Sequence, residues 1–242
     1  MTELSPVRCT ECPIRDRALF QVLSQNYLDE AGSRRAGQYR VAARTHLYQE
    51  SAPAAMAFTL FEGWLLLYRN HADGSRQGLR VSLPGDFVGY TPLTNGGYSH
   101  GALAVTDVVV CGFRQADLHE MIASQEDIAR QVSSIQARNL ALCESNVLGL
   151  GRKSAEQRLA HLIADLHHRL TRAAESEGGT RPLIVPFPLT QEMLGELAGL
   201  TPVHTNRVLR KLRLDGVTSC ERQRLEIMDL VRLHQIAGFQ PA

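Results

Sequence analysis

The spacing of apolar and polar positions changes twice along the chain, and each pattern predicts a different kind of structure. From about residue 20 to residue 113, short apolar runs alternate with turn signals such as Glu62-Gly63, Asp73-Gly74 and Pro84-Gly85-Asp86. Runs at this spacing predict an antiparallel barrel or jelly roll, and a closed roll offers an interior pocket for an effector. The expected strands occupy residues 57–61, 64–69, 78–83, 87–90 and 102–113.

Beyond residue 115 the apolar positions follow alternating four- and three-residue steps, which is the spacing of a long helix. The stripe comprises Ile128, Val132, Ile135, Asn139, Leu142 and Asn146. The helix could pack against the roll of its own chain or pair with a second copy of the chain. We expect pairing in a homodimer, because a helix of roughly 35 Å would project beyond a small roll. Gly149-Leu150-Gly151 after it predicts a hinge between two domains.

A third pattern, between Leu189 and Gly216, predicts two short helices joined by a tight turn. Thr190 is a good N-cap, Gly199 tolerates the positive φ that ends a helix, and Thr201-Pro202 begins the next one. The side chains expected on the exposed face of the second helix are His204, Asn206, Arg207, Arg210, Lys211 and Arg213. This pattern indicates a helix-turn-helix whose second helix enters the DNA major groove, although a helical hairpin with a solvated basic face is the alternative.

The segment that follows strengthens the DNA interpretation. Two β-prone runs flank Glu221-Arg222-Gln223-Arg224, which predicts a hairpin with a basic tip, the wing of a winged helix. Between residues 201 and 224 six basic side chains face only Asp215 and Glu221, whereas the whole chain carries a formal net charge of +1. Such a local excess of positive charge is typical of a surface that contacts phosphate, so double-stranded DNA is the expected partner.

Composition excludes several other classes of protein. A chain of 242 residues with 44% hydrophobic and 21% charged residues is typical of two modest globular domains. No apolar run approaches the roughly 18 residues of a membrane span, and the N-terminus has no apolar signal region, so we expect a cytoplasmic protein without a membrane partner. The P-loop and HExxH motifs of common enzymes are absent, which argues against an enzyme. A cupin-like metal enzyme using His46, His71 and His100 is a weaker alternative, because no HxH pair occurs.

The five cysteines follow no disulfide-framework spacing, and we expect reduced thiols. The pair Cys9-Thr-Glu-Cys12 could bind a soft metal or form a redox disulfide. A complete zinc or iron–sulfur site needs about four ligands, and the chain has no second CxxC. The expectation is therefore that no cofactor is bound.

The order of β-roll, long helix and winged helix resembles the Crp/Fnr family of bacterial transcription regulators, over nearly the whole chain. Its most specific motifs are Pro84-Gly85-Asp86-Phe87-Val88-Gly89 and Leu200-Thr201-Pro202-Val203-His204-Thr205-Asn206-Arg207. The resemblance implies an α+β protein that acts as a homodimer on a two-fold operator, with RNA polymerase as a further partner. The expected parts are an N-terminal arm (1–20), a jelly-roll domain (21–115), a dimerisation helix (116–150) and a winged helix-turn-helix domain (151–242).

The resemblance also implies which side chains touch DNA. Three exposed positions of the second helix would reach base edges, and they fall on Val203, Asn206 and Arg207. Arg207 suits guanine, whose O6 and N7 a guanidinium can bind together, and Val203 replaces an acidic residue common in the family, so a different operator is expected. Thr190 would contact a backbone phosphate. The full expected set is Thr190, Thr201, Pro202, Val203, His204, Asn206, Arg207, Arg210, Lys211, Arg222 and Arg224.

The sensor half departs further from the family. Members that bind cyclic AMP use a Glu and an Arg-Ser pair where this chain has Tyr90 and Tyr98-Ser99, so cyclic AMP is not expected. Members that sense oxygen hold a [4Fe–4S] cluster with four cysteines. Cys9, Cys12 and Cys111 resemble three of them, but the remaining one falls on Ala18. The chain therefore resembles the Fnr/FixK-like branch with an incomplete ligand set, and its signal is unknown or absent. The alternative is a redox or oxygen sensor that uses reactive thiols or a cluster completed by His46, His71 or His100.

Overall fold

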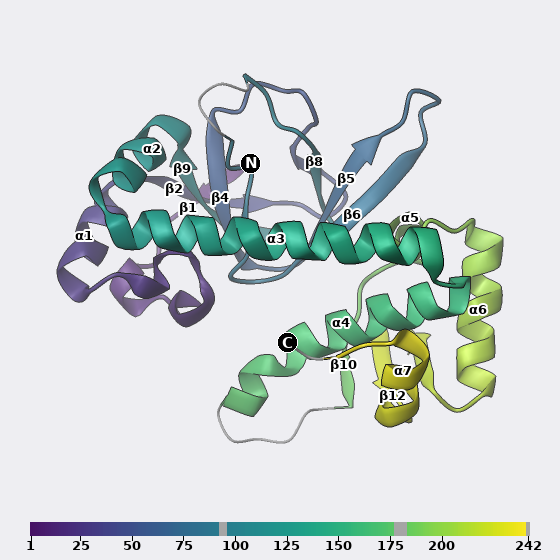
Figure 1. Ribbon diagram of the computed structural model, residues 1–242. Helices are drawn as coiled ribbons and strands as arrows, with labels where there is room; N and C mark the ends of the chain where they lie inside the picture. The colour runs from purple at the N-terminus through teal and green to yellow at the C-terminus, as the bar shows by residue number, and fades with distance from the viewer. Residues whose placement is uncertain (92–95, 177–182, 241–242) are drawn as a thin grey trace. The chain divides into compact units, whose positions relative to one another are not determined.

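The computed structural model describes residues 1–91, 96–176 and 183–240, and the chain divides into two compact units, Met1–Leu142 and Cys143–Ala242 (Figure 1). The first unit contains the expected antiparallel roll, built from two sheets. The five-stranded sheet has the order β1 (Thr2–Leu4), β2 (Arg35–Val41), β9 (Val108–Arg114), β4 (Met56–Glu62) and β7 (Phe87–Val88). The four-stranded sheet has the order β3 (His46–Tyr48), β8 (Gly101–Ala104), β5 (Leu65–Asn70) and β6 (Arg76–Ser82).

The turn residues in the sequence predicted the positions of most of these strands correctly. The strands β4, β5, β6 and β7 overlap the ranges expected from the sequence, whereas the range 102–113 forms β8 and β9 with a bend between them. The strands β2 and β3 were not predicted. In β2 the buried residues alternate poorly with exposed ones and include the polar Gln38, because both faces of this strand are partly covered. The first residues of the expected arm form β1, which pairs with β2.

Two hydrophobic cores stabilise the first unit. One lies between the sheets and contains Phe58, Leu65 and Val110; the other lies where helices cover the five-stranded sheet. The short 3-10 helices η1 (Cys9–Glu11), η2 (Arg15–Arg17) and η3 (Leu19–Val22) and the helix α1 (Gln25–Ser33) occupy a stretch with poor helix signals.

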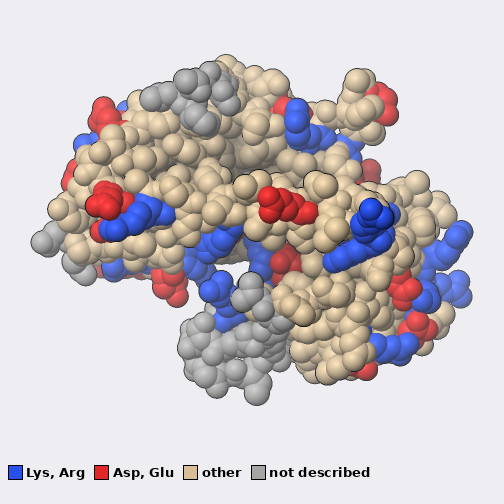
Figure 2. Space-filling view, viewed as in Figure 1, with Lys and Arg blue, Asp and Glu red and all other residues tan. Residues whose placement is uncertain are grey.

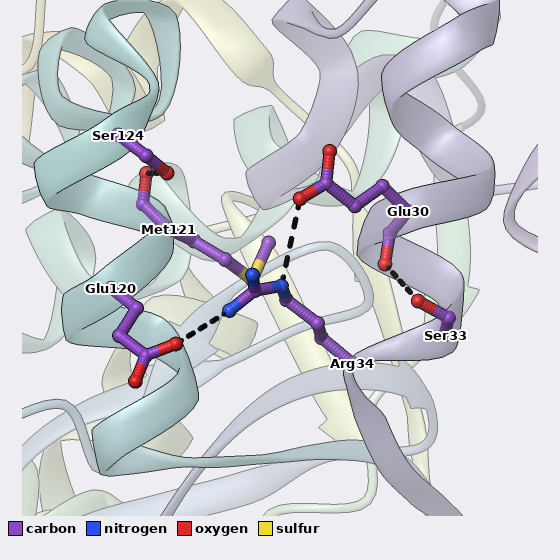
Figure 3. Close-up of polar contacts among 6 residues, drawn as sticks. All are labelled: Glu30, Ser33, Arg34, Glu120, Met121 and Ser124. Atoms are coloured by element: carbon purple, nitrogen blue, oxygen red, sulfur yellow. Dashed lines mark hydrogen bonds and ion pairs between the residues drawn. The ribbon is translucent and has the colours of Figure 1, made fainter.

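Arg34 connects α1 to α2 (Gln115–Ser124), which follows the last strand of the roll (Figure 3). Its Nη1 donates a hydrogen bond of 2.9 Å to Glu120 Oε2, and its Nε lies 3.6 Å from Glu30 Oε1. A serine hydroxyl also donates to a backbone carbonyl at the C-terminal end of each helix. The Ser33 hydroxyl donates to the Glu30 carbonyl, and the Ser124 hydroxyl donates to the Met121 carbonyl.

The region 116–150, expected as one helix, forms α2 and the longer α3 (Glu126–Arg152), because Gln125 between them is extended. Ile128, Val132 and Ile135 are at most 9% exposed and belong to the core under the roll's helices. Their expected place in a dimer interface was therefore wrong: they already pack against their own chain. Of the rest of that stripe, Asn139 and Leu142 are half-buried and Asn146 is exposed.

The expected hinge at residues 149–151 was also wrong. The helix α3 continues through both glycines, and the Lys153 amide donates to the Gly149 carbonyl at 3.0 Å. A helical glycine costs only about 1 kcal/mol relative to alanine, which packing can offset. The interruption comes at Lys153 and Ser154. There Ser154 and Gln157 form a capping box that starts α4 (Ala155–Ser176).

The second unit surrounds the apolar face of α4, whose Leu159, Ile163 and Leu166 are fully buried. Its other elements are β10 (Ile184–Pro186), α5 (Gln191–Ala198), α6 (Pro202–Leu214), β11 (Thr218–Glu221), β12 (Arg224–Ile227) and α7 (Leu230–Ala237). The three strands form a small antiparallel sheet in the order β10-β12-β11. The helix α7, which packs on α4, was not predicted. Among the described helices, none is long and apolar enough to cross a membrane.

Candidate nucleic-acid interface

Local capping interactions fix the two helices α5 and α6, as the sequence predicted. The Thr190 hydroxyl accepts a hydrogen bond from the Met193 amide at 3.2 Å, and Gly199 ends α5 at φ 63° and ψ 46°. Thr201 directly precedes Pro202, the first residue of α6, and its hydroxyl accepts a hydrogen bond from the His204 amide at 3.3 Å. The helix-turn-helix therefore has a side-chain cap at the start of each helix and a left-handed residue between them.

The close approach of α5 and α6 depends on Gly195, which the sequence analysis missed. A Cβ atom at this position would lie 2.7 Å from the Leu200 carbonyl oxygen and 3.0 Å from the Thr205 hydroxyl. Thr205 is fully buried, and its hydroxyl donates to the Thr201 carbonyl at 3.0 Å. Any larger residue at position 195 would push the two helices apart. The available signal was a glycine inside a helical pattern, where alanine would be more stable.

The exposed face of α6 carries the side chains expected there. Thr205, Val208 and Leu212 are buried on the opposite face, while Val203 is 73% exposed. Figure 2 shows Lys and Arg side chains along the edge of the second unit where Figure 1 places α6. The complete expected contact set is exposed: Thr190, Thr201, Pro202, Val203, His204, Asn206, Arg207, Arg210, Lys211, Arg222 and Arg224.

The hairpin after α6 has the geometry of a wing with a basic tip. Glu221 of β11 pairs with Arg224 of β12, so the loop contains only Arg222 and Gln223, at φ 51° and 60°. Two residues at positive φ make a type I′ turn, the form that matches the twist of a hairpin. The Gln223 carbonyl accepts a hydrogen bond of 2.8 Å from the Phe187 amide, which fixes the tip to the rest of the unit.

Ion pairs divide the basic side chains of this region into two groups. Lys211 forms an ion pair with Glu156 of α4, and Arg213 forms one with Glu221 of β11. The side chains of the other group have no hydrogen bond or ion pair with any residue in the described ranges. We call this group the four free arginines, Arg207, Arg210, Arg222 and Arg224. The local positive charge is therefore concentrated on α6 and the wing tip. The ion pairs Lys211–Glu156 and Arg213–Glu221 each join residues from different elements, so the sequence pattern did not reveal them.

Buried aromatic rings lie inside the roll at the position where the resemblance implies a ligand anchor. Tyr98 is 6% exposed, stacks on Tyr48 with 4.0 Å between ring centroids, and donates to the Met56 carbonyl at 2.7 Å. The Tyr48 hydroxyl lies 3.1 Å from His100 Nε2. Burial, together with the nearby positive charge of Arg80, lowers the pKa of His100 to about 4, so the ring is neutral at pH 7.

Arg80 is a cation inside this region that the sequence analysis overlooked. Its side chain is only 16% exposed, and its Nη1 lies 3.6 Å from Asp86 Oδ2. Arg80 acts electrostatically on both Tyr48 and His100. The carboxylate of Asp86 balances the positive charge of Arg80. Arg80 therefore needs no ligand phosphate to compensate its charge.

Three cysteines converge at the other side of the five-stranded sheet. Cys9 begins η1, Cys12 directly follows it and Cys111 lies in β9, and the neighbouring thiols contribute to raising the pKa of Cys9 and of Cys111. Burial raises the pKa of Cys9, and burial raises that of Cys111 to about 11, although Arg35 opposes both shifts. Such thiols are protonated at neutral pH in the metal-free chain.

Histidines do not complete the ligand set around these thiols. His46 bonds to the Tyr68 hydroxyl, His71 to Asp73, and His100 to Tyr48. Within the described ranges, no three or more His, Cys, Asp or Glu side chains are arranged to hold a metal ion. The residues present do not fit the four-ligand site that a [4Fe–4S] cluster needs, nor a cupin-like histidine site.

Two family models match this chain, one for each part. Residues 39–125 match the cyclic nucleotide-binding domain, and residues 157–236 match the Crp-like helix-turn-helix domain. Together the two matches include the aromatic interior of the roll, both helices of the helix-turn-helix and the wing. The antiparallel roll and the winged helix-turn-helix are thus supported by sequence families as well as by geometry.

Relatives of the whole chain are bacterial regulators. The transcriptional activatory protein AadR of Rhodopseudomonas palustris is 29% identical over 96% of this chain and 94% of its own length. The transcriptional activator protein FnrL of Cereibacter sphaeroides is 29% identical over 96% and 92%, and the nitrogen fixation regulation protein FixK of Bradyrhizobium diazoefficiens is 25% identical over 95% and 94%.

Solved structures share the fold. The structure of FixK2 from Bradyrhizobium japonicum has a TM-score of 0.74 at 22% identity, covering 84% of this chain and 98% of that chain. A Crp-family regulator from Thermus thermophilus has a TM-score of 0.64 at 23% identity, covering 83% and 97%. With its capped helix-turn-helix, basic wing and jelly roll, and with these relatives along its whole length, the chain belongs to the Crp/Fnr family of DNA-binding transcription regulators.

Proposed function

We propose that this protein is a cytoplasmic homodimer that binds a two-fold operator in double-stranded DNA and regulates transcription from it. The observation that carries the proposal is the group of four free arginines, exposed on α6 and the wing tip without a partner among the described residues. A guanidinium in this state is available for guanine edges and phosphates. Two copies of α6 would lie in successive major grooves about 34 Å apart.

Selection from a library of random duplexes tests this function. The protein is purified without oxygen and without added ligand, and the bound duplexes are sequenced. The proposal expects two inverted half-sites whose centres are separated by about one helical turn. Enrichment of an unpaired half-site, or of no sequence from a folded protein, would contradict it.

The exposed apolar residues of α3 support the homodimer and indicate a different face from the one first expected. Leu140 is 61% exposed and Val147, seven residues later on the same side of the helix, is 70% exposed. Apolar residues at heptad spacing pair helices of two chains. Val147→Glu, combined with Leu140→Glu, is expected to produce monomers in analytical ultracentrifugation. Val231→Glu, on the exposed face of α7, is the matched control and leaves the dimer intact.

The proposed regulator needs neither an iron–sulfur cluster nor cyclic AMP. The incomplete ligand set around Cys9 and Cys111 and the aromatic filling of the roll support this part of the proposal. Iron and acid-labile sulfide analysis of protein purified without oxygen should find less than one cluster per chain. Calorimetric titration with cyclic AMP should give no heat of binding. A stoichiometric cluster or a saturable cyclic AMP isotherm would disprove it.

The convergence of Cys9, Cys12 and Cys111 favours a second candidate function, a thiol-based redox sensor. Two of these thiols would form a disulfide while peroxide is reduced to water. The test compares operator affinity before and after peroxide treatment in the wild type and in Cys111→Ser. A loss of affinity in the wild type only, reversed by dithiothreitol, would support the sensor. Equal affinity throughout would exclude it.

The names of AadR and FnrL as activators support the proposal that this protein raises transcription and contacts RNA polymerase. It is proposed to have no catalytic activity of its own. Transcription in vitro from a promoter carrying the selected site, with purified RNA polymerase, tests both the partner and the sign of regulation. A decrease in transcript would contradict the activator role.

A further inference from the structure

The chain contains two lysines, Lys153 and Lys211, among its 26 Lys and Arg residues, and the two have different partners. Lys211 forms ion pairs with the carboxylates of Glu156 and, at 3.9 Å from Nζ to Oδ2, of Asp215. Lys153, between α3 and α4, contacts an imidazole instead: its Nζ lies 2.9 Å from His161 Nδ1. The sequence analysis singled out Lys211 but not Lys153.

The contact with Lys153 determines which nitrogen of His161 carries a proton. An ammonium group can only donate, so Nδ1 is the unprotonated nitrogen that accepts. The other ring nitrogen, Nε2, then carries the hydrogen and lies 3.4 Å from the Ser145 hydroxyl of α3. Burial and the charge of Lys153 lower the pKa of His161, although Asp165 and a backbone hydrogen bond at Ala237 oppose this shift. A neutral imidazole therefore lies against a primary amine.

Lys153 also contacts the end of α7 and is only half-buried. Its Nζ donates a second hydrogen bond, of 3.1 Å, to the carbonyl of Ala237, the last residue of α7. Its aliphatic chain passes near Gly149, where a Cβ atom would lie 3.9 Å from Lys153 Cδ. Partial burial lowers the pKa of Lys153. A lowered pKa leaves more of the amine uncharged, and the uncharged amine is the nucleophile.

We propose that Lys153 is an acylation site, where the amine reacts with an activated acyl donor (an acyl phosphate or an acyl thioester) and His161 Nδ1 acts as the general base. The Lys153 nitrogen attacks the acyl carbon, and an N–C bond forms. The bond from that carbon to the phosphate oxygen or thioester sulfur breaks, and its electron pair goes to the leaving group. Of the two protons that the ammonium loses, His161 passes one to water and the leaving phosphate or thiolate takes the other. The reaction needs neither DNA nor a second chain, so it is independent of the proposed function.

Acylation would change the contacts that fix the end of α7. The amide product is uncharged and has one N–H, so it cannot donate to both His161 and Ala237. Phe239, which follows α7, has its ring centroid 5.6 Å from that of His161 and 5.3 Å from that of His234. Loss of the Ala237 contact should loosen this end of α7, and the backbone amides there should exchange faster with solvent.

The test measures acetylation of the full-length, reduced protein by peptide mass spectrometry, with acetyl phosphate and acetyl coenzyme A as separate reagents. Lys211 is the comparison within the same chain. Lys153 is expected to react about tenfold faster than Lys211 or more, less than the roughly 100-fold that a fully positioned base contributes. A faster rate with only one reagent would also support the site and would identify its donor. Equal rates at the two lysines with both reagents would overturn the proposal.

His161→Asn separates the base from the hydrogen bond. Asparagine keeps an acceptor for Lys153 but is not a base, so the rate at Lys153 should fall to that at Lys211. The rate at Lys211 should stay unchanged, which reports that the unit is folded. His168→Asn, on the same helix and also beside Phe239, is the matched control and should change neither rate. A rate at Lys153 that stays high in His161→Asn would overturn the role of His161 as the base.

Hydrogen exchange followed by mass spectrometry tests the effect on α7. Acetylation of the wild type should accelerate exchange at the end of this helix. Lys153→Arg keeps the positive charge and is not acetylated at this position, so the same treatment should leave its α7 unchanged. Unchanged exchange in the acetylated wild type, or equal acceleration in Lys153→Arg, would overturn the link between Lys153 and α7.

Discussion

The two units of this protein differ in whether their key polar side chains have partners within the protein. In the second unit the four free arginines are exposed and have no partner among the described residues. In the first unit the polar groups inside the roll bind one another: Tyr98 to Met56, Tyr48 to His100, and Arg80 to Asp86. Unpaired exposed cations are available for an external anion, whereas internally paired groups must break existing contacts before a ligand can bind. The difference agrees with the Crp-like helix-turn-helix match of the second unit, and for the roll it agrees with the proposal that no cyclic AMP is bound there.

The largest expected effect is on the stability of the roll. Tyr98→Ala removes a buried ring and its hydrogen bond, which should lower the free energy of unfolding by about 3–5 kcal/mol. Tyr98→Phe keeps the stack and should cost about 1 kcal/mol. Urea denaturation measures both. At a temperature where Tyr98→Ala is folded, its operator affinity should remain within about twofold of the wild type; a large loss would mean that the roll takes part in recognition.

Arg207→Ala should have the largest effect on recognition. Loss of a bidentate guanine contact is expected to weaken operator binding by about 1–3 kcal/mol and to relax the preference at one base position. Fluorescence anisotropy with the operator and with its single-base variants measures this. Equal losses on specific and random duplexes would show that Arg207 contacts phosphate instead.

A smaller effect concerns pH and tests the burial of His100. The folded pKa of His100, about 4, lies below the ordinary value of 6.5, so between these values the unfolded chain binds more protons. Stability is therefore present above pH 6.5 and is lost as pH falls toward 4. The loss due to His100 should be about 1–2 kcal/mol after allowance for its partial exposure. His100→Gln should flatten the pH dependence of urea denaturation in this window. An unchanged slope would show that the ring is solvated.

The smallest effect is expected at the wing. Arg224→Gln removes one exposed cation without changing the hairpin turn, so affinity should fall by less than about 1 kcal/mol, equally for specific and random duplexes. The slope of log affinity against log salt should decrease by about 0.9. Lys211→Gln, whose charge is already paired with Glu156, should change that slope less. Equal changes in the two variants would remove the distinction between free and paired cations.

The sequence predicted interactions between residues that are close along the chain and missed those between residues that are far apart. The caps Thr190 and Thr201 and the left-handed Gly199 were predicted because their partners lie within three or four residues. The wing turn was predicted for the same reason. A helical stripe shows that a face is buried but does not identify what covers it, so Ile128 was assigned to a partner chain although it packs on its own roll.

Contacts between distant segments left no local pattern. The pairs Lys211–Glu156 and Asn206–Gln191 join residues 55 and 15 positions apart, and they became visible only when the helices were placed together. The Tyr48–Tyr98 stack has the same cause: β3 and the segment just before β8 bring the two rings into contact. These long-range contacts decide which cations are free and which interior positions are filled, and they therefore carry the functional argument.

Sedimentation of the reduced, chelator-treated protein with its selected duplex tests the central claim most directly. The account predicts a complex of two chains per duplex, formed without iron and without added ligand, with an affinity equal to that of untreated protein. Binding of a single chain per operator, or binding restored only by iron or another small molecule, would contradict it.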